Sequence, residues 1–546
     1  MILREYKYFC RGLSTKTAFP NKSGIAKRKQ FRFPKKMSLV DPVQIELNQT
    51  ERQIRDLLVS ASTAIDNADP NRKEDLVLRF TGGWVRDKLL GIPSNDLDVA
   101  INRMTGYEFA LKMKDFIESD QQFANAMKGF FKIDVNPEKS KHLETTTTKL
   151  YNLDVDLVNL RSEEYTETSR IPTMRFGTAE EDAFRRDATI NSLFYNLQTQ
   201  QIEDLTGKGL DDLRHRMIRT PLEPFKTFTD DPLRVLRLLR FASRLGFRID
   251  EQTQQVMSSD DVKRALGEKI SRERIGVELE KMLTGPDPRR SLLLIESLTL
   301  SDVVFFPLPG VLDDDHKSPK SLIQSTVPII KNLLSRRPVP ILSKNDFQNP
   351  SAMKFIYLYA ALLQWGTYMG HDRKKVGSVI FLIIRDSLKL PVATAVVVRD
   401  IACQAESIYQ VAAKTNYERK EVGLLVRSCG SQWTVFFFCS LCQQIVKLQN
   451  SSTIEQSSEA LIKQYQRLVS YIESNSLEDA WNLAPILNGN QIMKIMGLRG
   501  GQWMKDTVQK IIEWQLEYPE GTAAECEAFT MSMKDFIMQH YGASEV

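Results

Sequence analysis

The alternation of apolar and polar positions divides the chain into a mixed α/β part and a longer helical part. Residues 45–66 carry apolar side chains at helical spacing, whereas residues 76–83 and 95–101 alternate as strands do. From about residue 229 the helical period persists to the end of the chain, interrupted by segments rich in Pro and Gly. The pattern therefore predicts an α/β head followed by helical domains.

The turn residues between these segments complete the outline of the head. The further elements that we expect are a short helix over 84–91, a helix near 106–119, strands between 145 and 160 with Asn152 in their turn, a helix over 180–193, and a strand, turn, helix and strand over 201–220. The fold class predicted is α+β, with a small mixed sheet in the head and an all-helical remainder.

Composition limits the classes of protein to which the chain can belong. Its 546 residues are too many for one core, with 42% of them hydrophobic and 26% charged. No apolar run approaches the ~20 residues that a membrane span needs. Six cysteines in so long a chain do not form the dense framework of a disulfide-stapled protein. We expect several globular domains and no membrane partner.

The charge of the chain is concentrated at its N-terminus. Residues 1–37 hold eleven Lys or Arg and one acid, whereas the remaining 63 basic and 68 acidic residues nearly cancel. A basic, almost acid-free segment with interspersed hydroxyls is typical of a mitochondrial targeting leader, although a disordered basic tail has the same composition. Because Met37 follows this segment, we predict a second, shorter form made by initiation there, and hence a dual mitochondrial and cytoplasmic or nuclear location.

Two acids on one predicted strand are the first candidate for chemistry. In the segment NDLDVAI, Asp96 and Asp98 share one face of the strand, while Leu97 and Val99 share the other. Two carboxylates at this spacing can jointly hold divalent cations. A solvated strand face gives the same pattern, so the pair alone is weak evidence.

The preceding segment TGGWVRD makes the acidic pair more specific. Gly82 and Gly83 end a strand and open a helix, where the backbone can approach a phosphate closely. A strand, a Gly-Gly turn, a short helix and a strand with two acids are together typical of nucleotidyltransferases. A third carboxylate on a neighbouring strand usually completes such a site. In LDVDLVNLR we choose Asp156, which is central in its strand, over Asp154, which lies nearer the turn.

The segment FRRDATINSLFYN provides candidates for nucleotide binding. On the predicted helix, Asp187 and Asn191 are four residues apart and share a face that suits ribose hydroxyls. Arg185 and Arg186 precede them and suit a triphosphate. An ordinary charged helix start would explain any one of these residues, but it explains the whole group poorly.

The segment FTDDPLRVLRLLRFASRLGF raises three alternatives: a helix cap, a second metal site, or a surface that reads a base. Pro232 fits the first helical position, which makes Asp231 the N-cap. Asp231 and Arg234 also place an acceptor beside a forked donor, which complements the amino group and ring nitrogen of cytosine or adenine. Uracil and guanine present the reverse pattern. A basic stripe follows on the same helix and consists of Arg234, Arg237, Arg240 and Arg244. We expect the outer arginines of this stripe to contact phosphate.

Taken in order and spacing, these segments resemble the class II tRNA nucleotidyltransferases, the CCA-adding enzymes. The resemblance rests on TGGWVRDKLLG, NDLDVAI, RRDATINSLFYN, DDPLRVLRLLRFASRLGF and SRERIGVELEKML, and it is strongest from Leu76 to Leu283. The segments NPEKSKHLETTTTKL and PILNGNQIMKIMGLRGGQW are similar to the eukaryotic, fungal-like branch.

The resemblance implies a head, a neck, a body and a tail. With the leader, the boundaries that we expect are 1–37, 38–220, 221–285, 286–475 and 476–546. It implies addition of C, C and A to the 3′ end of tRNA, with CTP, ATP and Mg²⁺. A poly(A) polymerase of the same superfamily is the alternative, because it shares the head motifs. We expect the enzyme to bind the acceptor arm of tRNA and to act as a monomer.

The resemblance also assigns roles to residues of this chain. Asp96, Asp98 and Asp156 are the expected catalytic residues, the first two as ligands of the metal ions. The residues expected to bind the nucleotide are Gly82, Gly83, Arg86, Arg185, Arg186, Asp187, Asn191, Asp231, Arg234 and Arg237. The family's base-reading motif begins with Glu where this chain has Asp230, so no role follows for that residue. Arg272, Glu273 and Glu278 fall in a motif that supports the neck, and residues 139–144 match a loop implicated in the change from CTP to ATP.

Overall fold

The computed structural model describes residues 44–133, 145–166, 169–313, 319–343, 346, 349–373, 375–449 and 454–541. The described chain forms two compact units, one that ends at Val304 and one that begins at Phe305. The leader and the loop 139–144 lie outside the described residues, so the predictions made for them are not tested. The predicted division into head, neck, body and tail is finer than these two units and stays a prediction.

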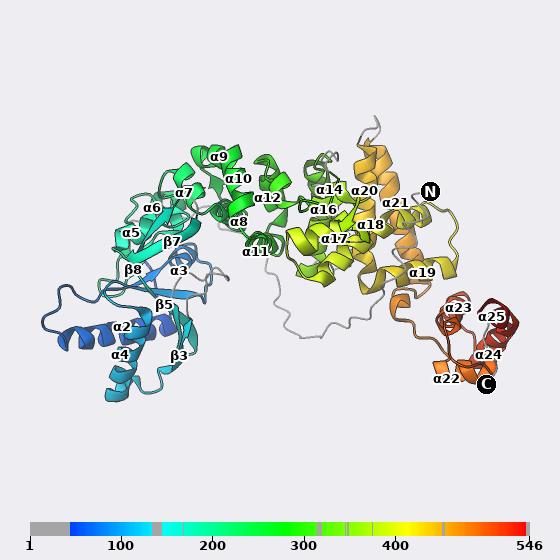
Figure 1. Ribbon diagram of the computed structural model, residues 1–546, viewed down its shortest axis with the longest axis horizontal. Coiled ribbons are helices and arrows are strands. Elements are labelled where there is room, and N and C mark those ends of the chain that lie inside the picture. The colour runs from blue at the N-terminus through cyan, green and yellow to red at the C-terminus, as the bar shows by residue number, and fades with distance from the viewer. Residues whose placement is uncertain are drawn as a thin grey trace. The chain divides into compact units, whose positions relative to one another are not determined.

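The first unit begins with the α/β head (Figure 1). Its elements are α2 (Gln49–Asn67), β1 (Leu78–Thr81), α3 (Gly83–Leu89), β2 (Leu97–Ile101), α4 (Gly106–Ser119), the 3₁₀ turn Gln121–Phe123, β3 (Met127–Ile133), β4 (Thr145–Leu150), β5 (Leu153–Asn159), β6 (Arg161–Thr166), β7 (Ser169–Phe176), α5 (Ala179–Phe184), the 3₁₀ turn Thr189–Asn191, β8 (Phe194–Asn196), β9 (Ile202–Glu203), α6 (Gly209–His215) and β10 (Met217–Ile218).

A seven-stranded mixed sheet is the centre of the head. The strand order is β3-β4-β5-β2-β1-β8-β9; β2 and β5 are parallel, and every other pair is antiparallel. Helices α2 and α4 pack side by side, and α4 covers β4 and β5 on one face (Figure 1). Gly106 permits this contact, because a Cβ there would lie 2.2 Å from the carbonyl oxygen of Leu157. The expected α+β fold is therefore confirmed.

Helices complete the first unit after the head. They are α7 (Pro224–Asp230), α8 (Leu233–Leu245), α9 (Glu251–Met257), α10 (Asp260–Lys269), α11 (Arg272–Leu283), α12 (Pro288–Ser297) and α13 (Ser301–Val304), with the short strand β11 (Arg248–Ile249) pairing β10. Helix α8 buries Leu and Val on one face and ends at Gly246, whose φ of 70° suits a glycine in the left-handed region.

One predicted helix is wrong in its length. The expected helix 180–193 is helical only as α5, to Phe184, and a 3₁₀ turn follows. Ala188 is extended, with φ −144° and ψ 143°, because the next residue is held by the second half of the head. The Thr189 amide donates to the carbonyl of Arg219 at 2.9 Å, and its hydroxyl donates to Asp212 at 2.7 Å. These tertiary bonds override the local helical preference.

The second unit is helical except for one hairpin. Its elements are α14 (Ile323–Ser335), α16 (Pro350–Leu362), the 3₁₀ turn Leu363–Trp365, β12 (Met369–Asp372), β13 (Lys375–Ser378), α17 (Val379–Leu382), the π-helical turn Ile383–Ser387, α18 (Val392–Ala412), α19 (Arg419–Cys429), the 3₁₀ turn Gly430–Gln432, α20 (Trp433–Leu448), α21 (Ile454–Ser474), the 3₁₀ turn Ala480–Asn482, α22 (Gly489–Met496), α23 (Trp503–Glu517), α24 (Ala523–Ser532) and α25 (Lys534–Tyr541).

Within the described chain, one helical stretch is long and apolar enough to cross a membrane by length and composition, Arg419–Leu448. It comprises α19 and α20, which meet at Gly430, and 61% of its most apolar window is buried inside the protein. Helix α20 packs against α14, α16, α18 and α21. The core helix of a globular domain has these same properties, so the stretch is weak evidence for a membrane span.

Candidate active site

The acids predicted from the strand pattern meet on neighbouring strands of the head sheet. Asp98 on β2 pairs in register with Asp156 on β5, and with Thr81 on β1. Directly paired residues project to the same face of a sheet, so the two carboxylates share the face opposite α4. Leu97 and Val99 are buried on the other face, as the alternation predicted.

Asp156 is held in place by the strand beside it. Its Oδ1 accepts a hydrogen bond of 2.6 Å from the Thr147 hydroxyl on β4, with which it is in register. Asp154 lies two residues earlier, 69% exposed and 2.7 Å from the Lys149 ammonium in an ion pair at the hairpin end. The structure thus brings Asp156, and not Asp154, to the other acids.

The electrostatics of the acidic group are unbalanced. Burial, together with the charges of Asp96 and Asp156, raises the pKa of Asp98 to about 7, although Arg186 partly opposes the shift. Among the described residues no three His, Cys, Asp or Glu side chains converge as a ready-made metal site. The donors present are carboxylate oxygens, which Mg²⁺ prefers, and a cation would relieve their mutual repulsion. The residues therefore fit a divalent ion.

The glycine turn lies directly beside the acids. Gly82 has φ 71° and ψ −134°, a conformation that residues with a side chain rarely adopt. A Cβ at this position would lie 3.1 Å from Nη1 of Arg186 and 3.7 Å from Oδ2 of Asp98. Gly83 begins α3 and is half-buried. The turn therefore brings the backbone, Arg186 and Asp98 together.

Arg186, which lies beside Gly82 and Asp98, is held by several contacts within the protein. Its Nε and Nη2 donate to Asp182 at 3.0 and 2.7 Å, its Nη1 donates to the carbonyl of Asn191 at 2.9 Å, and it lies over the Phe194 ring. Arg185 is held by Asp182 as well, at 2.9 Å, and by Glu163 at 2.9 Å. Although burial alone would raise it, the two arginines hold the pKa of Asp182 at about 2.

Asp187 and Asn191 meet as the spacing predicted, although on a bend and a 3₁₀ turn. The Asn191 amide donates to Asp187 Oδ1 at 2.9 Å, and Arg237 donates to Asp187 Oδ2 at 2.7 Å. Burial raises the pKa of Asp187, but Arg237 and Asn191 outweigh it, so that the net pKa lies well below the ordinary value. Arg86 is buried and donates to both Asp87 and Asn191.

Asp231, which we predicted to cap α8 and to read the base, lies just before this helix. Its backbone is extended, its Oδ1 accepts from the Leu233 amide at 3.3 Å, and its Oδ2 lies 3.4 Å from Arg274. The assigned helix α8 begins at Leu233, with Pro232 already in helical geometry. Arg234 is one turn further on, 7% exposed, with its guanidinium 3.8 Å from Glu163.

The arginines of the basic stripe on α8 pair with protein carboxylates, although Arg237 and Arg244 stay partly exposed. Arg237 pairs with Asp187, Arg240 with Glu278 at 2.6 Å, and Arg244 with Asp87 at 3.1 Å. The two outer arginines, for which we expected phosphate contact, therefore join the neck helices to each other and to the head. Glu278 is buried on α11, in agreement with the neck-supporting motif.

Two buried acids that accept hydrogen bonds from arginines of the site were not predicted from the sequence, Glu163 and Asp182. Glu163 accepts from Arg161 at 2.9 Å and from Arg185 at 2.9 Å, and its side chain is 4% exposed. Asp182 could have been found, because it precedes Arg185 and Arg186 by three and four residues on a helix. Glu163 could not, because Arg185 and Arg234 are far from it in sequence.

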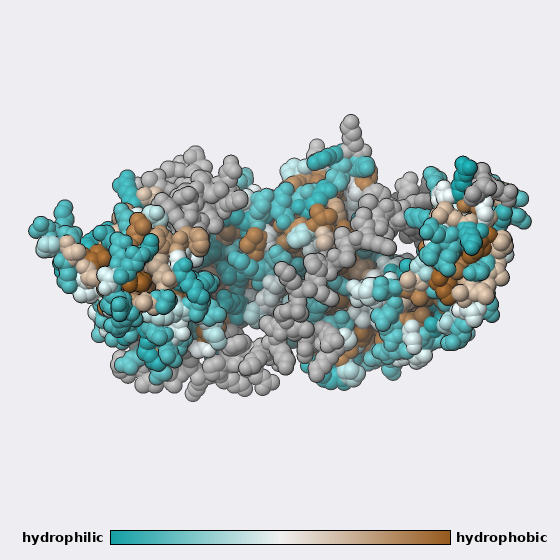
Figure 2. Space-filling model, turned by 90° about the horizontal axis from the view of Figure 1, so that it is seen from below, coloured by the Kyte–Doolittle hydropathy of each residue, from teal (hydrophilic) through white to brown (hydrophobic). Residues whose placement is uncertain are grey.

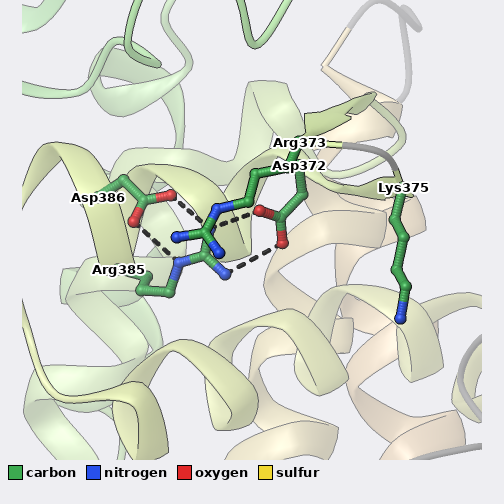
Figure 3. A pocket seen from close by; sticks show the side chains of 5 residues that line it. All are labelled: Asp372, Arg373, Lys375, Arg385 and Asp386. Carbon is green, nitrogen blue, oxygen red and sulfur yellow. Dashed lines mark hydrogen bonds and ion pairs between the residues drawn. The ribbon is translucent and has the colours of Figure 1, made fainter.

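A second charged hollow lies on the second unit, and Figure 3 shows its side chains. Arg385 donates to both carboxylate oxygens of Asp372, at 3.0 and 2.9 Å, and to Asp386. Arg373 and Lys375 complete the lining, and Lys375 points away from the ion pairs (Figure 3). This arrangement joins the β12–β13 hairpin to the π-helical turn.

Comparison with known proteins identifies the family to which the chain is similar. A family model described as "Poly A polymerase head domain" matches residues 78–219, and one described as "Probable RNA and SrmB- binding site of polymerase A" matches residues 246–312. The chain is 38% identical to the mitochondrial CCA tRNA nucleotidyltransferase of Saccharomyces cerevisiae, over 88% of this chain and 92% of that protein. It is 38% identical to the enzyme of the same name from Candida glabrata, over 91% and 98%.

Solved structures share the fold at lower identity. A CCA-adding enzyme in its apo form II has a TM-score of 0.60 and 19% identity, covering 89% of this chain and 96% of that one. Structures of CCA-adding enzymes with ATP, with CTP and, from Thermotoga maritima, with tRNA have TM-scores of 0.58, 0.55 and 0.52. The fold and the paired acids define a nucleotidyltransferase, a class of enzyme that typically needs a divalent metal ion. The chain belongs to the CCA tRNA nucleotidyltransferase family.

Proposed function

We propose that the protein adds C, C and A in turn to the 3′ end of tRNA, from CTP and ATP and without a nucleic-acid template. The observation that carries this proposal is the alignment of Asp98 and Asp156 on neighbouring strands beside Gly82 and Arg186. In the reaction the RNA 3′-hydroxyl oxygen bonds to the α-phosphorus, the bond from that phosphorus to the bridging oxygen breaks, and pyrophosphate leaves.

Asp96 and Asp98 would hold Mg²⁺, because Asp96, just before β2, and Asp98, on β2, offer oxygen donors with Asp156 alongside. When bound, the ions lower the pKa of the attacking hydroxyl and neutralise charge on the leaving group. The Thr147 hydroxyl fixes the Asp156 carboxylate. We assign to Asp156 the orientation of the RNA 3′-hydroxyl and the acceptance of its proton.

The triphosphate binds where the backbone and Arg186 are close together. Gly82 leaves room for a phosphate next to Arg186, and any larger residue would fill that space. Asp187 and Asn191 lie behind it and present oxygens and an amide to the ribose. Arg86, Arg185 and Arg237 each bind a carboxylate or amide of this group, so their part is to hold the nucleotide-binding side chains in place.

Asp231 and Arg234 select the base, acting as an acceptor and a donor at its edge. Two acids of the head interact with Arg234. Glu163 lies 3.8 Å from its guanidinium, and the charge of Arg234 lowers the pKa of Asp187. These acids hold the guanidinium in position. Cytosine and adenine offer the complementary pattern, whereas uracil and guanine do not.

Arg234→Ala tests the base selection. We expect the preference for CTP over UTP to fall by about 10- to 100-fold, because one good bidentate pair contributes ~1–3 kcal/mol of discrimination. Single-nucleotide incorporation with each NTP measures it, and Arg244→Ala on the same helix is the matched control. If Arg234→Ala rejects UTP as the parent protein does, the template assignment is wrong.

Product length separates this function from poly(A) polymerisation. The protein is incubated with tRNA lacking its terminal CCA and with each NTP separately or CTP and ATP together, and products are resolved by length. CTP alone should add two nucleotides and the mixture three. A long A-tract from ATP would support a poly(A) polymerase instead.

We further propose that the protein acts as a monomer on the tRNA acceptor arm and does not bind membranes. The two fungal relatives are named as mitochondrial, which supports a mitochondrial location for the form that carries the basic leader. Initiation at Met37 would produce a shorter form without the leader, which would locate to the cytoplasm and nucleus. Fusing residues 1–36 to a fluorescent reporter tests the leader, and a purely cytosolic signal would contradict it.

A further inference from the structure

A row of paired residues crosses the head sheet through the acids and ends at an exposed aromatic ring. In register, Asp98 pairs with Asp156, Asp156 with Thr147 on β4, and Thr147 with Phe131 on β3. Residues paired in this way project to one face, so Phe131 shares the face of the catalytic acids. Two strand spacings place its backbone about 10 Å from that of Asp156.

The exposure of Phe131 contrasts with that of its neighbour. Phe130 projects to the covered face, where its ring meets Tyr107 of α4 edge to face at 5.7 Å between centroids. Phe131 is 77% exposed, the highest value for a large hydrophobic side chain in the described part of the chain. On the face of the protein in Figure 2, apolar residues are exposed as separate patches in a mostly hydrophilic surface. An aromatic ring this exposed has no role in the core.

The other end of the row lies beside the proposed nucleotide-binding residues. On that side Asp98 pairs with Thr81, Thr81 pairs with Phe194, and Arg186 lies over the Phe194 ring. The incoming nucleotide therefore approaches the acids from the β1 side. In an in-line displacement the attacking oxygen must come from the side opposite the leaving group. This leaves the β4 and β3 side of the acids for the RNA.

From this geometry, and on the basis of the proposed function, we propose that Phe131 stacks on the 3′-terminal base of the RNA and so positions its hydroxyl beside Asp156. An aromatic ring suits this task because the terminal base is the tRNA's own last base at the first addition and a cytosine at the next two. Stacking accepts any base, since each has a π-face, whereas a hydrogen-bonding contact would favour one of them. Phe131 is thus a positioning residue for the primer.

Phe131→Ala tests the proposal through the kinetics of the two substrates. We expect the KM for tRNA lacking CCA to rise about tenfold, in line with base–aromatic stacking, while the KM for CTP stays unchanged. Phe131→Trp should restore the parent KM. Leu111→Ala is the matched control, because Leu111 is 41% exposed on α4, on the opposite face of the sheet.

A spectroscopic measurement distinguishes stacking from a loss of folding. An acceptor-stem RNA ending in 2-aminopurine should lose fluorescence when it binds the parent protein and Phe131→Trp, but not when it binds Phe131→Ala at saturation. The proposal would be overturned if Phe131→Ala quenched the fluorescence as much as the parent protein does. It would also be overturned if the KM of Phe131→Ala for tRNA equalled that of Leu111→Ala. If the parent protein fails to add CCA at all, it is the proposed function that falls.

Discussion

Two aspartates of the head, Asp98 and Asp182, both interact with Arg186 and differ in the sign of their pKa shifts. Burial and neighbouring carboxylates raise the pKa of Asp98 to about 7, whereas arginines hold that of Asp182 at about 2 despite its burial. Arg186 contacts Asp182 directly and also lowers the pKa of Asp98. Arg186 therefore lies between two acidic groups. Around Asp98 the negative charges exceed the positive ones, whereas Asp182 is neutralised by arginines.

The difference separates acids that have an arginine partner from acids that crowd one another. A buried carboxylate with its own arginine adds rigidity, and removing it leaves that arginine uncompensated. Carboxylates that crowd one another without such partners weaken the fold and are retained where a cation or a proton is to be bound. Asp187, paired with Arg237, belongs to the first group, and Asp96 and Asp156 belong with Asp98.

Removing an acid of the unbalanced group should have the largest effect on activity. Asp98→Asn is expected to lower kcat for both CTP and ATP incorporation by roughly 10³-fold or more, because the cation loses a charged ligand. Its thermal unfolding should be unchanged or occur at a higher temperature, since a repulsive charge is gone. Quenched-flow incorporation and calorimetry measure the two effects, and a large fall in Tm would contradict the comparison.

Removing an acid of the balanced group should have the opposite profile. Asp187→Asn removes the carboxylate to which Arg237 donates at 2.7 Å and leaves this half-exposed guanidinium with Glu278 at 3.9 Å, which we expect to cost about 2 kcal/mol of stability, or a fall in the Tm of the first unit of roughly 4–8 °C. Differential scanning calorimetry measures it. Should this variant melt with the parent protein, the Asp187–Arg237 pair would not be structural.

The pH dependence of stability distinguishes the groups again. Since the pKa of Asp182 is depressed to about 2, its contribution is fully present above the unfolded pKa of about 4 and is lost as pH falls towards about 2. Asp182→Asn should therefore be less stable by about 2 kcal/mol at neutral pH and lose less stability over that window. Acid unfolding followed by circular dichroism is the measurement, and parallel curves would refute the assignment.

The smallest effect is expected for the acid that the structure excludes. Asp154→Asn removes an exposed ion pair with Lys149 and should change Tm and kcat hardly at all, within about 1 kcal/mol. Asp156→Asn, two residues away on the same strand, should lower kcat by about 10²-fold. Equal activity losses in the two variants would show that register does not define the site.

The local features of the site could be predicted from the sequence, but its partners could not. Strand alternation assigned Asp98 and Asp156 to faces, and the extended Asp231 caps α8 as Pro232 indicated. The register that joins β2 to β5 depends on long-range pairing, as does the bond from Thr189 that ends the predicted helix 180–193. No periodicity encodes such contacts.

The arginines illustrate the same limit. A stripe of four basic residues on one helix face indicated a surface for phosphate, because the sequence does not show what that face meets. In the structure it meets Glu163, Asp187, Glu278 and Asp87, which come from four separate elements. Composition and spacing located the charges, and only the fold identified their partners.

Metal binding tests the central distinction between the two groups of acids most directly. Mn²⁺ is titrated into the parent protein, Asp98→Asn and Asp154→Asn without nucleotide, and free ion is followed by electron paramagnetic resonance. The account predicts that the parent protein and Asp154→Asn bind with similar affinity, and that Asp98→Asn binds at least about tenfold more weakly, because it lacks a charged ligand. Binding by Asp98→Asn equal to that of the parent protein would contradict it.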